Sequence, residues 1–210
     1  MHPPAPVHVI VAVALAYLAG SIPVAYRLSR GLGTDIFQAG DGNPGTANVF
    51  MSVSRSLGAA VFLLDALKGF TPVVLARVIG VHDAMLPLVG AAAVAGHWNP
   101  IFLKFRGGVG LATAIGAGLA LMPIAGTVGL ALGVAVAAGA RNTELGAGAG
   151  YTASMIASAA LKPGWSGSLG AVALALLVLI HREWLRGHHR RHDPATTATP
   201  KDELAHSNTQ

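Results

Sequence analysis

Apolar runs of membrane-spanning length, separated by short polar segments, dominate this sequence of 210 residues. Three of them cover residues 7–28, 57–80 and 84–103. A helix needs about 20 apolar residues to cross a hydrocarbon core of roughly 30 Å. With 53% hydrophobic residues, 11% charged residues and a mean hydropathy of +0.58, the chain is too apolar for an ordinary soluble domain. The sequence therefore predicts an all-α integral membrane protein built as a polytopic helical bundle.

Four further passes are predicted in the second half of the chain. Residues 113–140 form an apolar run that, at 1.5 Å per residue, would make a helix of about 40 Å. That length exceeds the hydrocarbon core, and Pro123 and Gly126 permit a break into two short passes. Residues 145–161 and 169–180 supply the last two passes, which brings the expected total to seven transmembrane helices.

Basic residues set the expected orientation of the bundle. Arg27 and Arg30 follow the first pass, and a His/Arg-rich segment follows the last. Because Lys and Arg accumulate in cytoplasmic loops, seven passes place the N-terminus outside and the C-terminus inside. Residues 193–210 are polar and lack hydrophobic periodicity, which predicts a disordered cytoplasmic tail after a membrane-embedded domain of residues 1–192.

The charge and cysteine content exclude some classes of function. Much of the net charge of +5 comes from the segment after His181, where it favours contact with anionic lipid headgroups over binding of nucleic acid. The absence of cysteine excludes thiolate metal sites and thiol nucleophiles. No residue pattern requires a metal ion or a cofactor.

A polar, glycine-rich run at residues 33–48 follows the first pass on the expected cytoplasmic side. Glycine permits positive φ and close backbone approach, so successive N–H groups can converge on a phosphate. Asparagine and threonine side chains add hydrogen-bond donors. A connecting loop in which Gly, Asn and Pro only make turns is an equally weighted alternative. The residues that would bind phosphate are Gly40, Gly42, Asn43, Gly45, Thr46 and Asn48.

A second glycine-rich turn at residues 104–110, KFRGGVG, faces the same side and again carries basic residues. Between the two turns, Asp65 and Lys68 lie near the start of the second pass and are spaced to share one helix face. Charges within a membrane segment usually point into the bundle and find a partner. We expect Asp65 and Lys68 to form a structural pair, with direct catalysis as the weaker alternative.

Two histidines are candidates for a general base. His97 lies where Gly96 and Pro100 predict a broken helix end, and His181 follows the last apolar run. Imidazole titrates near neutral pH and accepts a proton readily. For each histidine, a purely structural hydrogen bond to a neighbouring helix is at least as good an interpretation.

The order of five sequence blocks resembles the bacterial acyl-phosphate:glycerol-3-phosphate acyltransferase family, PlsY. The blocks are GSIP, GDGNPGTANV, LLDALKG, GHWNPIFLKFRGGVGLAT and IHREW, and the resemblance covers most of residues 20–187. Members of that family are seven-helix enzymes of the bacterial cytoplasmic membrane. They transfer a fatty acyl group from acyl phosphate to the 1-hydroxyl of glycerol 3-phosphate and produce lysophosphatidic acid for phospholipid synthesis.

The resemblance implies two phosphate-carrying substrates and a site that combines anion-binding loops with a groove between helices. The first loop would hold one phosphate. The second turn and the helix after it would line the rest of the site with Gly107, Gly108, Gly110 and Thr113. Because acyl phosphate is already activated, positioning and charge neutralisation suffice for much of the catalysis, and no covalent acyl-enzyme is required.

Five positions depart from the family pattern. Asp41 stands where the family usually has Ser, and Trp184 where it has Asn; three usual cations are replaced by Phe37, Met51 and Val109. The cations associated with the glycerol phosphate headgroup are therefore largely absent, while the glycine loop is kept. Nearby basic residues that would compensate are Arg55, Lys104, Arg106 and Arg182.

Three functions remain open on these residues. The first is transfer of an acyl group to glycerol 3-phosphate, with the nearby basic residues replacing the missing cations. The second is an acyltransferase with a different, less anionic hydroxyl acceptor. The third is a non-catalytic paralogue that binds a lipid or a partner.

Overall fold

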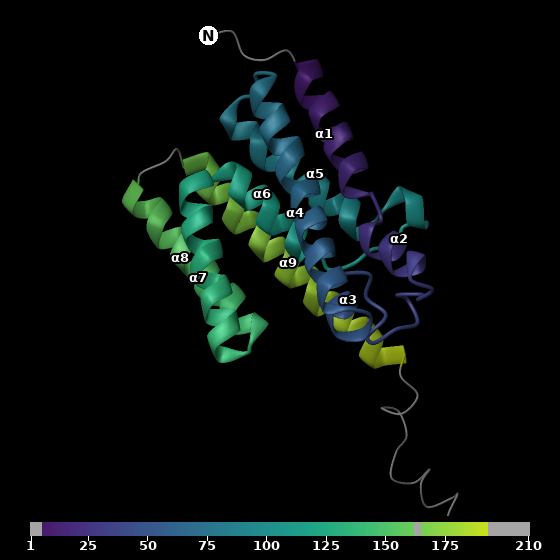
Figure 1. Cartoon of the computed structure of the whole chain (residues 1–210). Coiled ribbons are helices and arrows are strands. Elements are labelled where there is room, and N and C mark those ends of the chain that lie inside the picture. Colours follow the sequence, from purple (N-terminus) through teal and green to yellow (C-terminus); the bar gives the residue numbers. More distant parts are fainter. Residues whose placement is uncertain (1–5, 162–164, 193–210) are drawn as a thin grey trace, which may run out of the picture.

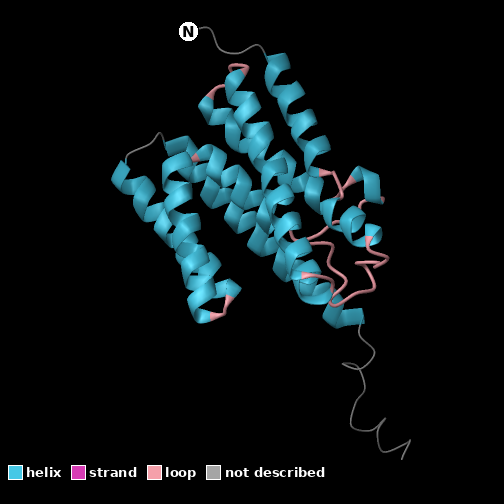
Figure 2. Ribbon diagram, viewed as in Figure 1, coloured by secondary structure: helices cyan, strands magenta, loops and turns pink. Residues whose placement is uncertain are grey.

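The computed structural model describes residues 6–161 and 165–192, and the described residues are helices joined by turns and loops, without a strand (Figure 2). The predicted tail at residues 193–210 lies outside the described residues. The elements, in chain order, are α1 Pro6–Gly20, α2 Val24–Gly31, α3 Thr46–Ser52, α4 Arg55–Val78, η1 Asp83–Met85, α5 Leu86–Trp98, η2 Ile101–Leu103, α6 Leu111–Leu121, α7 Pro123–Ala140, α8 Thr143–Leu161 and α9 Trp165–His192.

Helices occupy every segment in which a membrane pass is predicted. Within the described residues, five segments are long and apolar enough to cross a membrane: Val7–Gly31, Arg55–Val78, Asp83–Leu103, Pro123–Ala140 and Ser166–Leu185. Helix α6 is apolar but shorter, and α8 is not among the five. The helical membrane fold therefore agrees with the sequence, while the count of seven passes stays a prediction.

Pro123 breaks the long apolar run as expected, because α6 ends at Leu121 and α7 begins at Pro123. The first pass, in contrast, is not one continuous helix. Helix α1 ends at Gly20 and α2 starts at Val24, since Pro23 has no N–H to continue the hydrogen-bond ladder. The first glycine-rich run also differs from a simple loop, because its last residues begin the short helix α3.

Helix α4 is the centre of the bundle and packs against α1, α3, α5 and α6. The close approach of α4 to α6 rests on small residues: a side chain on Gly69 would clash with the backbone of Thr113, and one on Gly116 with the backbone of Ala66. Helix α9 covers α5 and α6. The buried core between these helices is aliphatic, with Val73, Leu86, Val89 and Leu174 among its members.

Helices α7 and α8 form a hairpin beside this bundle (Figure 1). Their interface consists largely of small residues, with Gly129 and Gly133 facing Gly146 and Gly150. Small residues allow helix backbones to approach closely in a membrane.

Polar loops gather at one end of the molecule. Figure 1 shows the first turns of α1 and the α4–α5 turn at one end, and α2, α3 and the last turns of α9 at the other. The long loops drawn in Figure 2 lie at this second end. Both glycine-rich turns therefore meet at the same end of the bundle, as the sequence predicts.

Candidate active site

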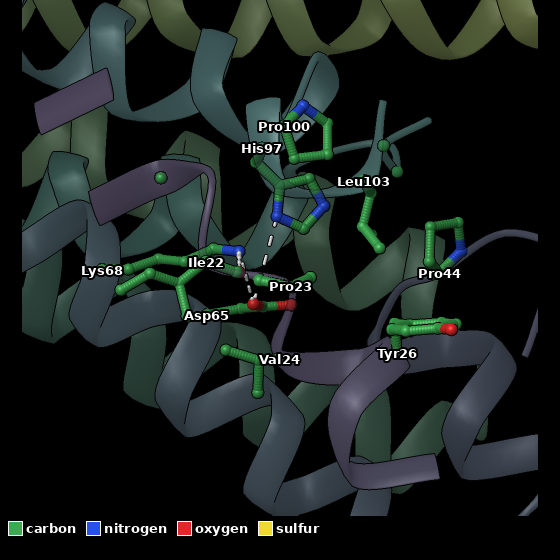
Figure 3. A pocket seen from close by; sticks show the side chains of 13 residues that line it. Ile22, Pro23, Val24, Tyr26, Pro44, Asp65, Lys68, His97, Pro100 and Leu103 are labelled. Atoms are coloured by element: carbon green, nitrogen blue, oxygen red, sulfur yellow. Dashed lines mark hydrogen bonds and ion pairs between the residues drawn. The ribbon is translucent and has the colours of Figure 1, made fainter. Parts of the chain in front are cut away.

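A cleft opens where the break between α1 and α2 meets α4, α5 and the two glycine-rich turns (Figure 3). Irregular backbone at membrane depth occurs where it lines a cavity or is buried in protein. Here the break supplies part of the wall, and the ionisable side chains of Asp65, Lys68 and His97 come from α4 and α5. The lining residues are Gly20, Ile22, Pro23, Val24, Tyr26, Pro44, Asp65, Lys68, His97, Pro100, Leu103, Gly107 and Gly108.

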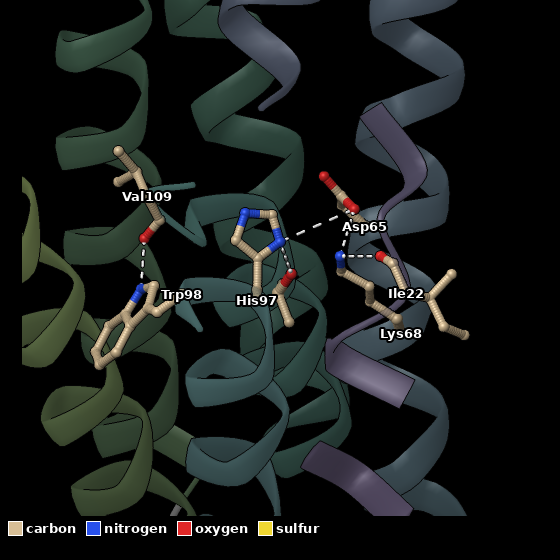
Figure 4. Close-up of polar contacts among 7 residues, drawn as sticks. Ile22, Asp65, Lys68, His97, Trp98 and Val109 are labelled. Atoms are coloured by element: carbon tan, nitrogen blue, oxygen red, sulfur yellow. Dashed lines mark hydrogen bonds and ion pairs between the residues drawn. The ribbon is translucent and has the colours of Figure 1, made fainter. Parts of the chain in front are cut away.

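Asp65 and Lys68 form a buried ion pair on α4. Lys68 Nζ lies 2.9 Å from Asp65 Oδ1, and the side chains are 7% and 2% exposed respectively. Lys68 Nζ also donates a hydrogen bond of 3.0 Å to the carbonyl oxygen of Ile22 in the α1–α2 break (Figure 4). The pair therefore ties α4 to the irregular segment that forms the wall of the cleft.

His97 presents its two ring nitrogens to different surroundings. Its side chain is 6% exposed, and Nδ1 lies 3.3 Å from Thr113 Oγ1 and 4.0 Å from Asp65 Oδ1. Nε2 is buried and has no hydrogen-bond partner among the described residues. A β-carbon on Gly108 would lie 2.9 Å from His97 Nε2 and 3.0 Å from Asn43 Oδ1. Nε2 therefore faces the meeting point of the two glycine-rich turns.

Three amides of the first glycine-rich loop donate hydrogen bonds within the loop itself. Gly40 and Gly42 have positive φ of 57° and 71°, whereas Gly45 is extended. The amides of Gly42, Asn43 and Gly45 donate within the loop, to Ala39 O, Asp41 Oδ1 and Asn43 O. These three amides are therefore engaged within the loop, and the phosphate-binding role expected of the loop stays a prediction.

Asn48 holds the first loop together. Its Nδ2 lies within hydrogen-bond distance of the carbonyl oxygens of Ile36, Ala39 and Asn43, and its Oδ1 accepts a hydrogen bond from Ser52. Both polar atoms of the side chain are thus used inside the loop. Thr46 differs, because its hydroxyl oxygen is buried without a hydrogen-bond partner among the described residues.

The second glycine-rich turn is fixed against the end of α5. The Gly108 amide donates to His97 O, and Trp98 Nε1 donates to Val109 O at 2.8 Å. A side chain on Gly107 would clash with the backbone carbonyls of His97 and Trp98. Gly110, with φ of 81°, precedes α6 and so turns the chain towards Thr113.

Arg106 lies over the ring of Phe37, with its guanidinium carbon 4.4 Å from the ring centroid. The Phe37 ring in turn packs against Tyr26, at a centroid distance of 5.8 Å, and Tyr26 lines the cleft. Two residues with left-handed φ, Lys104 at 52° and Phe105 at 64°, precede Arg106. Such conformations are strained by roughly 1 to 3 kcal/mol each, and here they direct the turn that carries Arg106.

The described residues that line the cleft include neither His181 nor the sequence-predicted cations Arg55, Lys104, Arg106 and Arg182. Arg55 starts α4 and is exposed, Lys104 is exposed, and Arg182 is half-buried on α9. His181 stacks between two indoles, with its ring centroid 4.4 Å from that of Trp98 and 5.9 Å from that of Trp184. His181 is therefore held in an aromatic stack against Trp98, the residue that follows His97 at the end of α5.

Sequence reasoning missed the contributions of Ile22, Pro23 and Tyr26 to the cleft. The GSIP block was the available signal, because a proline three residues after a glycine interrupts an otherwise continuous apolar run. From the sequence, Phe37 is only a position at which a cation usual in the family is missing. Its contact with Arg106 joins segments that are distant in the chain, so the sequence does not predict it.

Known proteins with similar sequences identify the family of this chain. Residues 10–189 match the family described as glycerol-3-phosphate acyltransferase. The chain belongs to the glycerol-3-phosphate acyltransferase family. It is 39% identical over 175 residues to the glycerol-3-phosphate acyltransferase of Geobacter sulfurreducens, covering 82% of this chain and 90% of the relative. It is 43% identical over 173 residues to that of Myxococcus xanthus, covering 81% and 90%.

Solved structures of the family share the fold. The crystal structure of the integral membrane glycerol 3-phosphate acyltransferase PlsY in its glycerol 3-phosphate form aligns with a TM-score of 0.74 and 29% identity. The alignment covers 85% of this chain and 90% of that chain. The lysophosphatidic acid form of PlsY gives a TM-score of 0.73. The predicted family and the predicted helical membrane fold are thereby confirmed.

Proposed function

We propose that this chain is a membrane acyltransferase that moves a fatty acyl group from acyl phosphate to glycerol 3-phosphate and produces lysophosphatidic acid. Membership of the glycerol-3-phosphate acyltransferase family supports the reaction class and the acceptor. The PlsY neighbours, one in a glycerol 3-phosphate form and one in a lysophosphatidic acid form, correspond to acceptor and product. The observation that carries the catalytic assignment is the buried, unpartnered Nε2 of His97 at the junction of the two glycine-rich turns.

His97 acts as the general base in this proposal. The 1-hydroxyl oxygen of glycerol 3-phosphate attacks the acyl carbon while His97 Nε2 takes the hydroxyl proton. The new ester C–O bond replaces the bond between the acyl carbon and the phosphate oxygen, and phosphate leaves with that electron pair. General base catalysis by a positioned imidazole typically contributes about 10² to 10⁴ in rate.

Between the two histidines, the geometry favours His97 over His181. His97 lines the cleft and has a nitrogen without a partner in the described residues, whereas His181 lies in an aromatic stack outside the lining set. His181 and Trp98 then support the second turn from behind, because the Trp98 indole N–H holds Val109 O.

Phosphate binding is assigned to side chains more than to loop amides. Thr46 Oγ1 is buried and unpartnered among the described residues, and the Asn43 side chain lies beside Gly108 at the mouth of the cleft. Arg106 supplies a cation over Phe37, whose ring packs against Tyr26 in the cleft lining. These groups support binding of two phosphate-bearing substrates, although this chain has Phe37, Met51 and Val109 where the family usually has cations.

The same proposal places the protein in the inner, cytoplasmic membrane of a bacterial cell. Apolar spans embed the bundle, and an acyl phosphate with a lipid-soluble chain reaches the cleft from the membrane while glycerol 3-phosphate reaches it from the aqueous end. The orientation with the glycine-rich turns in the cytoplasm follows from the basic residues at that end.

An acceptor panel tests the proposal. Purified protein in lipid vesicles receives acyl-labelled acyl phosphate with glycerol 3-phosphate, glycerol or a long-chain alcohol, and labelled esters are identified by mass spectrometry. We expect lysophosphatidic acid from glycerol 3-phosphate, with one phosphate released per ester. Preferential esterification of an uncharged alcohol would instead identify a different acceptor. No ester with any acceptor would identify a non-catalytic paralogue.

A further inference from the structure

The connection between α5 and α6 divides its side chains between the cleft and the outside of the molecule. The members that line the cleft (Figure 3) are Pro100, Leu103, Gly107 and Gly108. Between them in sequence, three large apolar residues are exposed: Ile101 at 48%, Phe102 at 57% and Phe105 at 61%. One segment therefore borders the cleft on one side and the surroundings of the protein on the other.

The exposed side of this connection also carries cations, at the point where a membrane span ends. The apolar span Asp83–Leu103 is followed directly by Lys104, and Arg106 comes two residues later. Both side chains are exposed. Arg106 lies over the Phe37 ring, whereas Lys104 makes no ion pair with any described residue. Aromatic rings and long cationic side chains at the end of a span are typical of the level of the lipid headgroups.

The backbone holds Lys104 and Phe105 in an unfavourable conformation. Their φ angles are 52° and 64°, in the left-handed region that few residues other than Gly, Asn and Asp adopt readily. Such strain persists only where surrounding contacts hold the conformation, and it concentrates at functional sites. The Phe105 amide donates to Pro100 O, which fixes the backbone of the turn. The Phe105 ring and the Lys104 ammonium, in contrast, are directed to the surroundings of the protein.

Charge selects the kind of lipid that fits this surface. The four residues Ile101, Phe102, Lys104 and Phe105, here called the Lys104 surface, combine exposed apolar area with one unpaired ammonium. An anionic headgroup offers its phosphate to that ammonium without an opposing charge, whereas a zwitterionic headgroup brings a cation of its own. For this reason, basic residues close to a membrane attract anionic lipid.

We infer that the Lys104 surface is a docking site for an anionic phospholipid, with the lipid phosphate at the Lys104 ammonium and the first acyl carbons against the two phenylalanine rings. Because the same connection lines the cleft, a lipid docked there holds the wall of the cleft in place and raises the rate of acyl transfer. The docking site stands without the proposed function; only the effect on the rate rests on that function.

Native mass spectrometry of the full-length protein tests the docking site. The protein is released from micelles that contain equal amounts of phosphatidylglycerol and phosphatidylcholine, and the lipids that stay bound are counted. Lys104→Asn and Phe105→Asn each suit the left-handed backbone, because asparagine adopts positive φ readily, and each removes one lipid-binding group. We expect the native protein to retain phosphatidylglycerol preferentially, and Lys104→Asn to reduce that preference about fivefold, the effect of one basic residue near an anionic surface.

Arg141→Asn is the matched control. Arg141 is also an exposed cation with left-handed φ, 50°, but it lies in the α7–α8 turn between Ala140 and Asn142, without a neighbouring aromatic residue. The preference for phosphatidylglycerol should survive this substitution. An equal loss in Lys104→Asn and Arg141→Asn, or no preference in the native protein, would overturn the docking site.

A spin label measures whether the Lys104 surface touches lipid. The chain contains no cysteine, so a nitroxide on Ile101→Cys is the only label on the protein. In vesicles with phosphatidylglycerol, we expect oxygen, which concentrates in lipid, to reach this label better than a water-soluble nickel complex. A label on Gln38→Cys, which is exposed in the first glycine-rich loop, should show the opposite order. Equal access of the nickel complex to both labels would contradict the inference.

Rates of acyl transfer in two kinds of vesicle test the effect on the cleft. We expect a higher rate with phosphatidylglycerol than with phosphatidylcholine alone, and a ratio of the two rates that falls about fivefold in Lys104→Asn and is kept in Arg141→Asn. Inorganic phosphate added to phosphatidylcholine vesicles should not raise the rate; an increase would identify a site for free phosphate instead of lipid.

The outcomes separate this inference from the proposed function. Equal rates of acyl transfer by the native protein in both kinds of vesicle would overturn the effect of the lipid and leave the proposed function standing. Preferential binding of phosphatidylglycerol by a native protein that forms no ester would do the reverse: it would support the docking site and overturn the proposed function.

Discussion

At the residue scale, the site depends on the close contact between Gly108 and His97. The end of α5 and the second glycine-rich turn approach each other closely. The space between the α-carbon of Gly108 and His97 Nε2 holds a hydrogen atom but no side chain. The imidazole is therefore positioned by Gly108 on its Nε2 side and by Asp65 and Thr113 on its Nδ1 side.

Gly108→Ala should reduce catalysis without unfolding the protein. The added β-carbon would lie 2.9 Å from His97 Nε2 and 3.0 Å from Asn43 Oδ1, so both side chains would have to shift. Because a misplacement of about 1 Å can cost about 100-fold in rate, we expect kcat to fall by about that factor. The measurement is steady-state formation of lysophosphatidic acid, with Gly118→Ala as control, since no neighbouring atoms crowd that position. Unchanged kcat in Gly108→Ala would show that Nε2 does not work from this position.

Arg106→Gln should weaken recognition of the anionic acceptor. A charge-assisted hydrogen bond to phosphate contributes roughly 1.5 to 3 kcal/mol, which corresponds to a rise in the KM for glycerol 3-phosphate of about tenfold to hundredfold. The KM for acyl phosphate should change less, and Phe37→Leu, which removes the ring beneath the guanidinium, should have a smaller effect of the same kind. Arg55→Gln removes an equal charge at the exposed start of α4, without an aromatic ring beneath it in the described contacts, and serves as the matched control. Equal effects of the two substitutions would exclude a specific role for Arg106.

Of the residues named from the sequence, Asp65, Lys68, His97, Gly107 and Gly108 line the cleft, and the roles expected of them stay predictions. The glycines of the first loop were expected to present amides to a phosphate, yet the amides of Gly42, Asn43 and Gly45 bond within the loop. Asn48 is expected to bind substrate, and in the structure its Nδ2 donates to two carbonyl oxygens of the loop. The sequence alone does not distinguish donors that hold the loop together from donors that bind a ligand. The same N–H group can donate to a carbonyl oxygen of the loop or to a phosphate oxygen.

At the element scale, small residues decide how closely helices approach. The α4–α6 crossing brings Asp65 to Thr113, and the α7–α8 hairpin is built on Gly129, Gly133, Gly146 and Gly150. In a membrane, where lipid is as apolar as a leucine side chain, such close packing is a main source of helix association. The first crossing positions the site, whereas the hairpin stands beside the bundle (Figure 1).

Gly150→Leu should separate the hairpin and lower thermal stability more than activity at low temperature. Its β-carbon would lie 2.6 Å from Gly129 O and 3.0 Å from Gly133 Cα. Overpacking costs about 1 to 3 kcal/mol, which corresponds to a decrease in Tm of about 5 °C for a chain of this size. The check is a thermal-unfolding curve in detergent. Gly148→Leu lies on the same helix with open space around the position and should leave Tm unchanged; an equal decrease in both variants would contradict the proposed interface.

Helix positions followed from the sequence because length and hydrophobicity of a run decide whether it forms a membrane helix. The break at Pro123 was predicted from an excess of length. The break at Pro23 was missed because residues 7–28 form a run of suitable length for one pass, and α3 was missed because its seven residues follow a loop sequence. Local irregularity of this kind is set by tertiary contacts, such as that of Lys68 with Ile22 O.

At the scale of the whole molecule, the proposed reaction and topology require both glycine-rich turns and the end of α9 to face the same compartment. Figure 1 places α2, α3 and the last turns of α9 at one end, opposite the α4–α5 turn. Glycerol 3-phosphate must then enter from that end. The orientation of this end towards the cytoplasm is a prediction from the basic residues.

A reporter inserted at His82 should be external, and one fused after Arg191 should be cytoplasmic. The measurement is the activity of a side-specific pair of reporters, such as a phosphatase that is active only outside and a fluorescent protein that is active only inside. The reversed pattern would place the cleft on the side that lacks glycerol 3-phosphate. Identical locations for the two sites would contradict the odd number of passes predicted between His82 and the tail.

The most direct test of the central claim is the initial rate of lysophosphatidic acid formation by the purified native protein and by His97→Gln and His181→Gln, from acyl phosphate and glycerol 3-phosphate. The account predicts ester formation by the native protein, a decrease of about 100-fold or more in His97→Gln, and a much smaller decrease in His181→Gln. Native rates in His97→Gln, or no lysophosphatidic acid from the native protein, would contradict it.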